Sequence, residues 1–218
     1  MSQIHQKKQV RGINKDQLEI FLTKKIRRFT NAKVELEQYA TPPQIIASIV
    51  HHAHMAGDIE GKIVVDLCAG TGGFAIAASL KGAKKVFAVE YDLEAIKILE
   101  ENIRRTETDV QIIQADGRAW RPPEKADTVF LNPPFGIKQK TFKDSQFIKQ
   151  AFQYSKVIYA IVDGVKRNLP FFSEMARKEG WILKGYYSEN FDLPATLNFH
   201  KKRRKQIPVL ILQFLKKK

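Results

Sequence analysis

Cysteine is nearly missing from this chain, which has only Cys68 among its 218 residues. One thiol can form neither an intrachain disulfide framework nor a cysteine-based zinc cluster. Long apolar runs are missing too, since the longest fall far below the ~20 residues that span a membrane. The first residues are polar and basic, unlike a secretory signal. We therefore expect a cytoplasmic protein with no membrane partner and the size of one α/β domain plus a short extension.

Acidic residues are scarce: 23 aspartates and glutamates stand against 37 lysines and arginines, which gives a formal net charge of +14. The excess lies near the two ends of the chain, whereas residues 58–130 are nearly balanced in sign. One cluster is the run Lys201, Lys202, Arg203, Arg204 and Lys205. Basic segments that flank a neutral core indicate that a polyanion is bound along them. The alternative, a run of solvated charges, stays open.

Repeats and low-complexity linkers are absent, so the chain divides only at its basic start. We assign residues 1–35 to a basic N-terminal extension with one amphipathic helix, and residues 36–218 to the main domain. The helix is predicted over residues 14–29, because apolar residues recur there at helical spacing on one face. Asn14 stands where a residue that caps this helix is expected.

Five apolar runs, separated by segments of helical periodicity, predict parallel strands. They lie near residues 62–67, 85–90, 110–114, 127–131 and 157–162. Two more strands, near residues 181–190 and 207–215, have no long helix between them and should pair antiparallel. The sequence thus predicts an α/β fold with a Rossmann-like, seven-stranded sheet, mostly parallel with an antiparallel last strand and helices on both faces. The connection at residues 192–205 is long enough to indicate a function.

A glycine-rich turn follows the first predicted strand. The strand ends at Asp66, the turn contains Cys68, Gly70 and Gly72, and helical periodicity then resumes. Glycines let the backbone turn tightly and let a ligand approach it closely. Glu90 ends the next strand 20 residues after Gly70. An acid at about this interval binds ribose hydroxyls in dinucleotide-type α/β units.

The nucleotide can be narrowed to S-adenosylmethionine. The turn lacks both the signature of a triphosphate-binding loop and the complete Gly-x-Gly-x-x-Gly fingerprint. The ammonium of S-adenosylmethionine would meet the glycine turn, its ribose would meet the end of the second strand, and its adenine would meet the end of the third. The residues assigned to the cofactor at these two strand ends are Glu90, Tyr91, Asp116 and Gly117.

Asn132, Pro133, Pro134 and Phe135 follow the fourth predicted strand. The amide oxygen of Asn132 can accept a hydrogen bond from an amino N–H, and the carbonyl of Asn132 or Pro133 can accept a second. The two prolines stiffen the loop, and Phe135 can stack on a flat ring. An ordinary strand-end turn is the alternative for the tetrapeptide alone. Its predicted place beside the glycine turn, at the carboxyl edge of the sheet, favours these four residues as catalytic.

His51 and His54 are three residues apart on a predicted helix. This spacing is compatible with metal binding, but no acid or cysteine is nearby in the sequence. We therefore expect no metal site.

The chain resembles class I S-adenosylmethionine-dependent methyltransferases that carry an Asn-Pro-Pro-Phe motif. More narrowly, it is similar to the methyltransferase-like protein 5 family of ribosomal-RNA adenine-N6 methyltransferases. The similarity rests on residues 36–43 (LEQYATPP), 66–72 (DLCAGTG), 132–136 (NPPFG), 192–195 (DLPA) and 199–202 (FHKK). Cys68 departs from the pattern, because the family usually has glycine there.

The resemblance implies a methyltransferase sheet and a set of binding residues. Gln38, Tyr39 and Thr41 would close over the cofactor, with Glu90 and Asp116 holding its ribose and adenine. It also implies a small zinc-ribbon activator subunit as a partner.

We expect direct methyl transfer from the sulfonium to an adenine N6 in RNA, most plausibly ribosomal RNA, with Lys201 to Lys205 as RNA contacts. The base must leave its stack to reach the site, so single-stranded or loop RNA is favoured. Guanine-N2 methylation of RNA and protein-glutamine N5 methylation remain alternatives, although the latter usually has tyrosine at position 135. A non-catalytic RNA-binding scaffold would be expected to have lost Asn132 or Glu90, and both are present.

Overall fold

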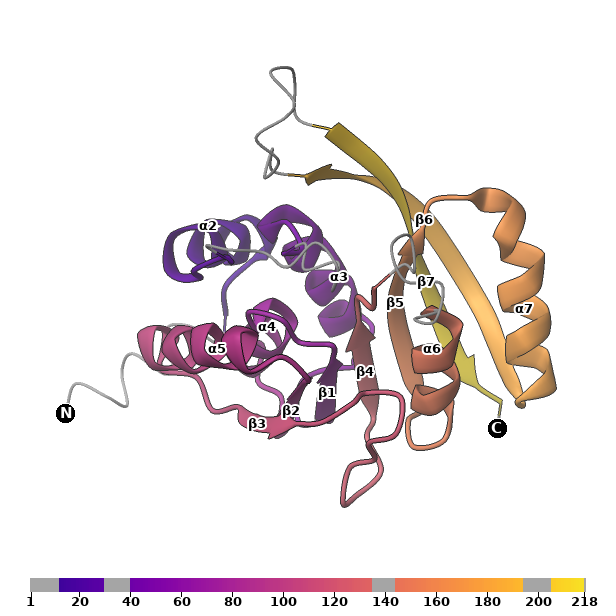
Figure 1. Ribbon diagram of the computed structural model, residues 1–218, viewed down its shortest axis with the longest axis horizontal. Helices are drawn as coiled ribbons and strands as arrows, with labels where there is room; N and C mark the ends of the chain where they lie inside the picture. Colours follow the sequence, from indigo (N-terminus) through magenta and orange to yellow (C-terminus); the bar gives the residue numbers. More distant parts are fainter. Residues whose placement is uncertain (1–11, 30–39, 135–143, 194–204, 218) are drawn as a thin grey trace.

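The computed structural model describes residues 12–29, 40–134, 144–193 and 205–217. Its centre is a seven-stranded sheet with the strand order β3-β2-β1-β4-β5-β7-β6 (Figure 1). The strands are β1 (Ile63–Leu67), β2 (Lys85–Glu90), β3 (Gln111–Gln114), β4 (Thr128–Leu131), β5 (Val157–Asp163), β6 (Trp181–Leu193) and β7 (Lys205–Lys216). The first five strands are mutually parallel, and β7 pairs antiparallel with both β5 and β6. The predicted fold class is confirmed.

Helices cover both faces of this sheet. They are α2 (Lys15–Lys25), α3 (Pro43–Met55), α4 (Gly73–Leu80), α5 (Leu93–Thr106), α6 (Asp144–Phe152) and α7 (Leu169–Lys178), with a 3-10 turn, η2, at Lys166–Asn168. The apolar run of β1 serves both faces, because Val64 packs with the cluster under α2, α3 and α4, while Val65 packs with the cluster under α6 and α7. This two-sided burial explains why the parallel strands appear in the sequence as continuous apolar runs.

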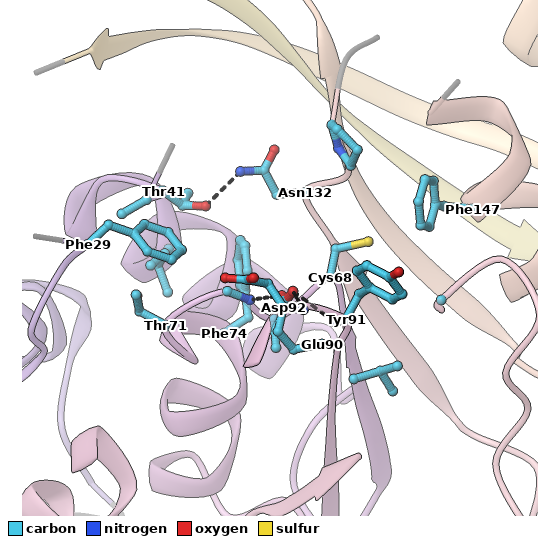
Figure 2. A pocket seen from close by; sticks show the side chains of 18 of the residues that line it. Phe29, Thr41, Cys68, Thr71, Phe74, Glu90, Tyr91, Asp92, Asn132 and Phe147 are labelled. Atoms are coloured by element: carbon cyan, nitrogen blue, oxygen red, sulfur yellow. Dashed lines mark hydrogen bonds between the residues drawn. The ribbon is translucent and has the colours of Figure 1, made fainter. Parts of the chain in front are cut away.

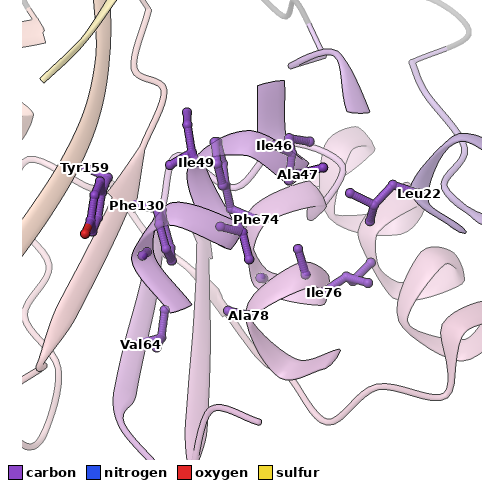
Figure 3. Close-up of a cluster of buried hydrophobic side chains, with 14 of the residues drawn as sticks. Leu22, Ile46, Ala47, Ile49, Val64, Phe74, Ile76, Ala78, Phe130 and Tyr159 are labelled. Carbon is purple, nitrogen blue, oxygen red and sulfur yellow. The ribbon is translucent and has the colours of Figure 1, made fainter. Parts of the chain in front are cut away.

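Stacked aromatic rings fill the centre of the first cluster. Phe130 lies between Phe74 and Tyr159, with ring centroids 5.3 Å and 5.5 Å away (Figure 3). Phe74 belongs to the helix that follows the glycine turn, and Phe130 belongs to the strand that precedes Asn132. The packing therefore fixes these two segments relative to each other.

The predicted N-terminal helix is present as α2, and Asn14 caps it as expected. Asn14 and Gln17 form a reciprocal capping box, in which each side chain accepts a hydrogen bond from the other's backbone N–H at 2.9 Å. The helix ends at Lys25, earlier than the predicted residue 29, because Ile26 adopts an extended conformation. Leu18 and Leu22 are buried in the first cluster. The division of the chain at residue 35 stays a prediction.

The β6–β7 hairpin projects past the carboxyl ends of the parallel strands (Figure 1). β5 pairs with β7 only as far as Asp163 and Val209, whereas β6 and β7 go on pairing as far as Leu193 and Lys205. Of the basic run, Lys205 is the first residue of β7, and residues 201–204 lie outside the described residues. The hairpin directs this run beyond the edge where the glycine turn and Asn132 lie.

Within the described part of the chain, no helix has both the length and the apolar character required to cross a membrane.

Candidate cofactor and substrate site

A cavity of about 250 Å³ opens at the carboxyl ends of β3, β2, β1 and β4 (Figure 2). The predicted site residues that line it are Thr41, Cys68, Gly70, Glu90, Tyr91, Asp116, Gly117, Asn132 and Pro134. Ligands of open α/β sheets bind at this edge. The structure therefore brings the glycine turn, the two strand-end acids and the Asn-Pro-Pro segment to one place. The predicted residues Gln38, Tyr39 and Phe135 lie outside the described residues.

Asp66, Gly72 and Pro133 support the cavity rather than line it. The side chain of Asp66 is 1% exposed, and its Oδ2 accepts a hydrogen bond from the Ala75 N–H at 2.8 Å. Burial raises the pKa of Asp66 to about 7. Asp66 thus fastens the first turn of α4 from beneath the glycine turn.

The glycine turn uses three left-handed residues: Cys68 at φ 70°, Gly70 at φ 53° and Gly72 at φ 88°. A Cβ atom on Gly72 would lie 2.2 Å from Leu99 Cδ1, so this position needs glycine for space as well as for conformation. Cys68 makes the first left-handed step without being glycine, at a conformational cost of about 1–2 kcal/mol. Burial raises the pKa of its thiol, so the sulfur stays protonated near neutral pH.

Glu90 connects the end of β2 to the glycine turn. Its Oε2 accepts a hydrogen bond from the Gly70 N–H at 2.7 Å, and its Oε1 accepts from the N–H groups of Tyr91 and Asp92 at 2.8 and 2.9 Å. Burial raises the pKa of Glu90, and the three N–H groups act against that shift. A carboxylate has about four acceptor positions. Glu90 therefore holds the turn and keeps one position for a ligand hydroxyl.

Asp116 forms a two-point ion pair with Arg118 at the end of β3. Arg118 Nε lies 2.9 Å from Asp116 Oδ1, and Arg118 Nη2 lies 2.5 Å from Oδ2. This partner lowers the pKa of the Asp116 carboxyl. Both residues line the cavity, but Arg118 was not predicted from the sequence, since an arginine two residues after an acid is common in loops. Asp116 therefore faces the adenine end of the cavity already neutralised.

Asn132 has one end of its amide fixed and the other end available. Its Nδ2 donates a hydrogen bond to Thr41 Oγ1 at 2.9 Å, across 91 positions of sequence (Figure 2). Its Oδ1 is buried and accepts no hydrogen bond within the described residues. A buried acceptor without a partner is costly unless a ligand satisfies it. The arrangement is suited to a ligand that brings an N–H group.

Several residues that line the cavity were not predicted. They are Leu22, Ile26, Arg28, Phe29, Ala40, Pro43, Ile46, Ala69, Thr71, Gly73, Phe74, Val89, Asp92, Ala115, Arg118 and Phe147. Most continue from predicted site residues in the sequence. The N-terminal residues among them had been assigned to an extension, and no local signal connects them with a binding site.

Comparisons with known proteins agree with this geometry. The model of a family described as "conserved hypothetical protein 95" matches residues 47–169. The rRNA N(6)-adenosine-methyltransferase Mettl5 of Drosophila melanogaster is 32% identical over 194 residues, which cover 85% of this chain and 89% of that protein. A Pyrococcus horikoshii protein provisionally described as an RNA methyltransferase has a crystal structure that is 34% identical, with a TM-score of 0.84, covering 94% of this chain and 98% of its own.

A more distant structure was solved with a ligand. TYW2 of Methanocaldococcus jannaschii, in complex with AdoMet, is 25% identical with a TM-score of 0.52, and the match covers 76% of this chain and 75% of that one.

Proposed function

Because the chain belongs to the METTL5 family of methyltransferases, we propose that it transfers a methyl group from S-adenosylmethionine to the exocyclic N6 of an adenine in RNA, most plausibly ribosomal RNA. The observation that carries this proposal is the orientation of Asn132. Thr41 holds the NH2 end of the amide, so the buried oxygen is left to accept a hydrogen bond from an amino group.

The residues at the strand ends fit S-adenosylmethionine. Glu90 keeps one acceptor position for a ribose hydroxyl, and the glycine turn leaves its backbone open to close approach. Asp116 and Gly117, at the third strand end, would face the adenine. Bound there, the cofactor supplies an electrophilic methyl group on a positively charged sulfur.

The protein's contribution to the reaction is to position the amine. The lone pair of an adenine N6 is delocalised into the ring, so the nitrogen is a weak nucleophile. In the proposal, Asn132 Oδ1 accepts one N6–H and the carbonyl of Asn132 or Pro133 accepts the other, which favours a more tetrahedral nitrogen aligned with the methyl group. Catalysis then comes from orientation and fixed dipoles rather than from a strong base. The stacking of Phe135 on the base remains part of the proposal.

The RNA would enter at the carboxyl edge of the sheet. The β6–β7 hairpin supports this, because it extends past β5 toward the basic run at residues 201–205. A flipped or single-stranded adenine could then reach the cavity while phosphates contact the hairpin.

Three finer statements belong to the same proposal. A small zinc-ribbon subunit would dock on an exposed edge of the sheet, and β3 and β6 are the two edge strands. The protein would act in the cytoplasm. Residues 1–35 would form an extension to a methyltransferase domain at residues 36–218.

The test is mass analysis of nucleosides from ribosomal RNA that has been incubated with the enzyme and isotopically labelled cofactor. Labelled N6-methyladenosine is the expected product, and Asn132→Ala should abolish it while leaving cofactor affinity within a few fold. Labelled N2-methylguanosine would move the chain to the first alternative. Label found only in protein glutamine would overturn RNA as the substrate.

A further inference from the structure

The segment that follows α2 forms one wall of the cavity. After Ile26 the chain is extended, and Ile26, Arg28 and Phe29 all line the cavity although they precede residue 35. The segment therefore belongs spatially to the cofactor site that begins at Gly70.

Asn102, on α5, attaches this segment to the glycine turn. Its Oδ1 accepts a hydrogen bond from the Arg27 N–H at 2.8 Å, and its Nδ2 donates to the Arg27 carbonyl at 3.0 Å. The same Nδ2 donates to the Thr71 carbonyl at 2.9 Å. Asn102 is 0% exposed, so each of these bonds is shielded from water. One buried amide thus joins the N-terminal segment to the backbone beside Gly70.

Two exposed contacts lie alongside this amide. Arg27 forms an ion pair with Glu101 at 2.8 Å, and Arg105 Nε donates a hydrogen bond to the Lys25 carbonyl at 3.0 Å. Exposed pairs contribute little to stability, so Asn102 is the main attachment.

The ring of Phe29 covers the glycine turn. A Cβ atom on Gly70 would lie 3.5 Å from Phe29 Cζ, which is ordinary contact distance for a ring lying against that turn. In Figure 2 the ring lies on the same side of the cavity as Thr41 and Thr71. Because the sheet order is β3-β2-β1-β4, an adenine at β3 and a ribose at β2 leave the amino-acid end of the cofactor at β1, under this ring.

We propose that Phe29, held over the glycine turn by Asn102, is a binding residue for the amino-acid end of S-adenosylmethionine. The proposal rests on the cofactor named under the proposed function. Phe29 contacts the aliphatic chain that joins the sulfur to the ammonium and excludes water from it, and Asn102 is a positioning residue that acts through Phe29.

The experiment compares two ligands without RNA. Calorimetry measures the affinity for S-adenosylmethionine and for 5′-methylthioadenosine, which has the same nucleoside but no amino-acid end. Phe29→Ala should weaken S-adenosylmethionine binding about tenfold, as expected for loss of part of a buried aromatic contact, and should change 5′-methylthioadenosine binding less than twofold. In steady-state assays, KM for the cofactor should rise while kcat stays near its wild-type value.

Phe21→Ala is the matched control. Phe21 is also a half-buried phenylalanine of the N-terminal region that packs against the first cluster, but it does not line the cavity. It should leave both affinities unchanged. Asn102→Asp, which keeps an acceptor for the Arg27 N–H but loses both donated bonds, should reproduce the pattern of Phe29→Ala if the variant folds.

Equal losses for the two ligands, or no loss for either, would overturn the role of Phe29. If the wild-type protein binds neither ligand, the proposed function fails first, and this outcome is distinct from the other two.

Discussion

Replacing Thr41 by valine tests how the orientation of Asn132 determines the reaction. Valine keeps the shape of threonine but lacks the oxygen that accepts from Asn132 Nδ2 at 2.9 Å. A hydrogen bond contributes about 0.5–1.5 kcal/mol net, and a buried donor left without a partner costs about 1–3 kcal/mol. The amide can then rotate by half a turn to find another acceptor. In that orientation its NH2 group, instead of its oxygen, would face the amino group of the base.

The expected result is a fall in kcat of about tenfold at saturating cofactor and RNA, because ~1.4 kcal/mol of orientation energy corresponds to a factor of ten. Thr41→Ser, which restores the oxygen, should return kcat to within about twofold of the wild type. Single-turnover measurements with a quench step would separate the methyl transfer from product release.

Thr41 also lines the cavity and is predicted to contact the cofactor. A loss of that contact alone would raise KM for S-adenosylmethionine and leave kcat unchanged. A valine variant with normal kcat, or a serine variant as slow as the valine variant, would refute the proposed orientation of the amide.

Four further predictions concern the acids, the turn and the basic run. Glu90→Ala should weaken cofactor binding by calorimetry, since each lost charge-assisted bond contributes about 1.5–3 kcal/mol; unchanged affinity would remove Glu90 from the ribose site. Asp66 has a pKa raised from 3.8 to about 7, so the native state keeps a proton that the unfolded chain has lost. The free energy of unfolding should therefore fall as pH rises from about 4 to about 7 and level off above, and urea denaturation of Asp66→Asn should show this slope removed. Cys68→Gly should raise the free energy of unfolding by about 0.5–1 kcal/mol, because glycine accepts φ 70° without strain; a destabilised variant would argue against strain at this position. Changing all of residues 201–205 to serine should flatten the salt dependence of RNA binding by about 0.7 log units per lost phosphate contact, whereas an unchanged slope would mean that these charges are only solvated.

The sequence predicts well what depends on neighbouring residues. The strands were recognisable because both of their faces are buried, and Asn14 was recognisable because a capping box is contained within four residues. The site was partly predictable for a related reason. In a parallel sheet, residues that end consecutive strands meet at one edge, so Gly70, Glu90 and Asn132 could be placed together without any contact map.

What the sequence could not predict depends on partners far along the chain. Asn102 reads locally as an ordinary polar residue of a helix, but it bonds Arg27, 75 positions away, and Thr71, 31 positions away. Thr41 could be named as a site residue only by resemblance, and its bond to Asn132 spans 91 positions. Such pairs have no periodicity, so no window of sequence contains the information.

The attachment of the N-terminal segment changes how RNA binding should be assigned to it. Deleting residues 1–30 would remove basic residues, but it would also remove Leu18 and Leu22 from the core and Phe29 from the cavity wall. Loss of RNA binding after such a deletion would thus have two causes that cannot be separated. Changing the exposed Lys24 and Lys25 to serine removes charge and leaves these contacts in place. Only a salt slope that falls in this variant, with cofactor affinity unchanged, would assign an RNA contact to the N-terminal segment.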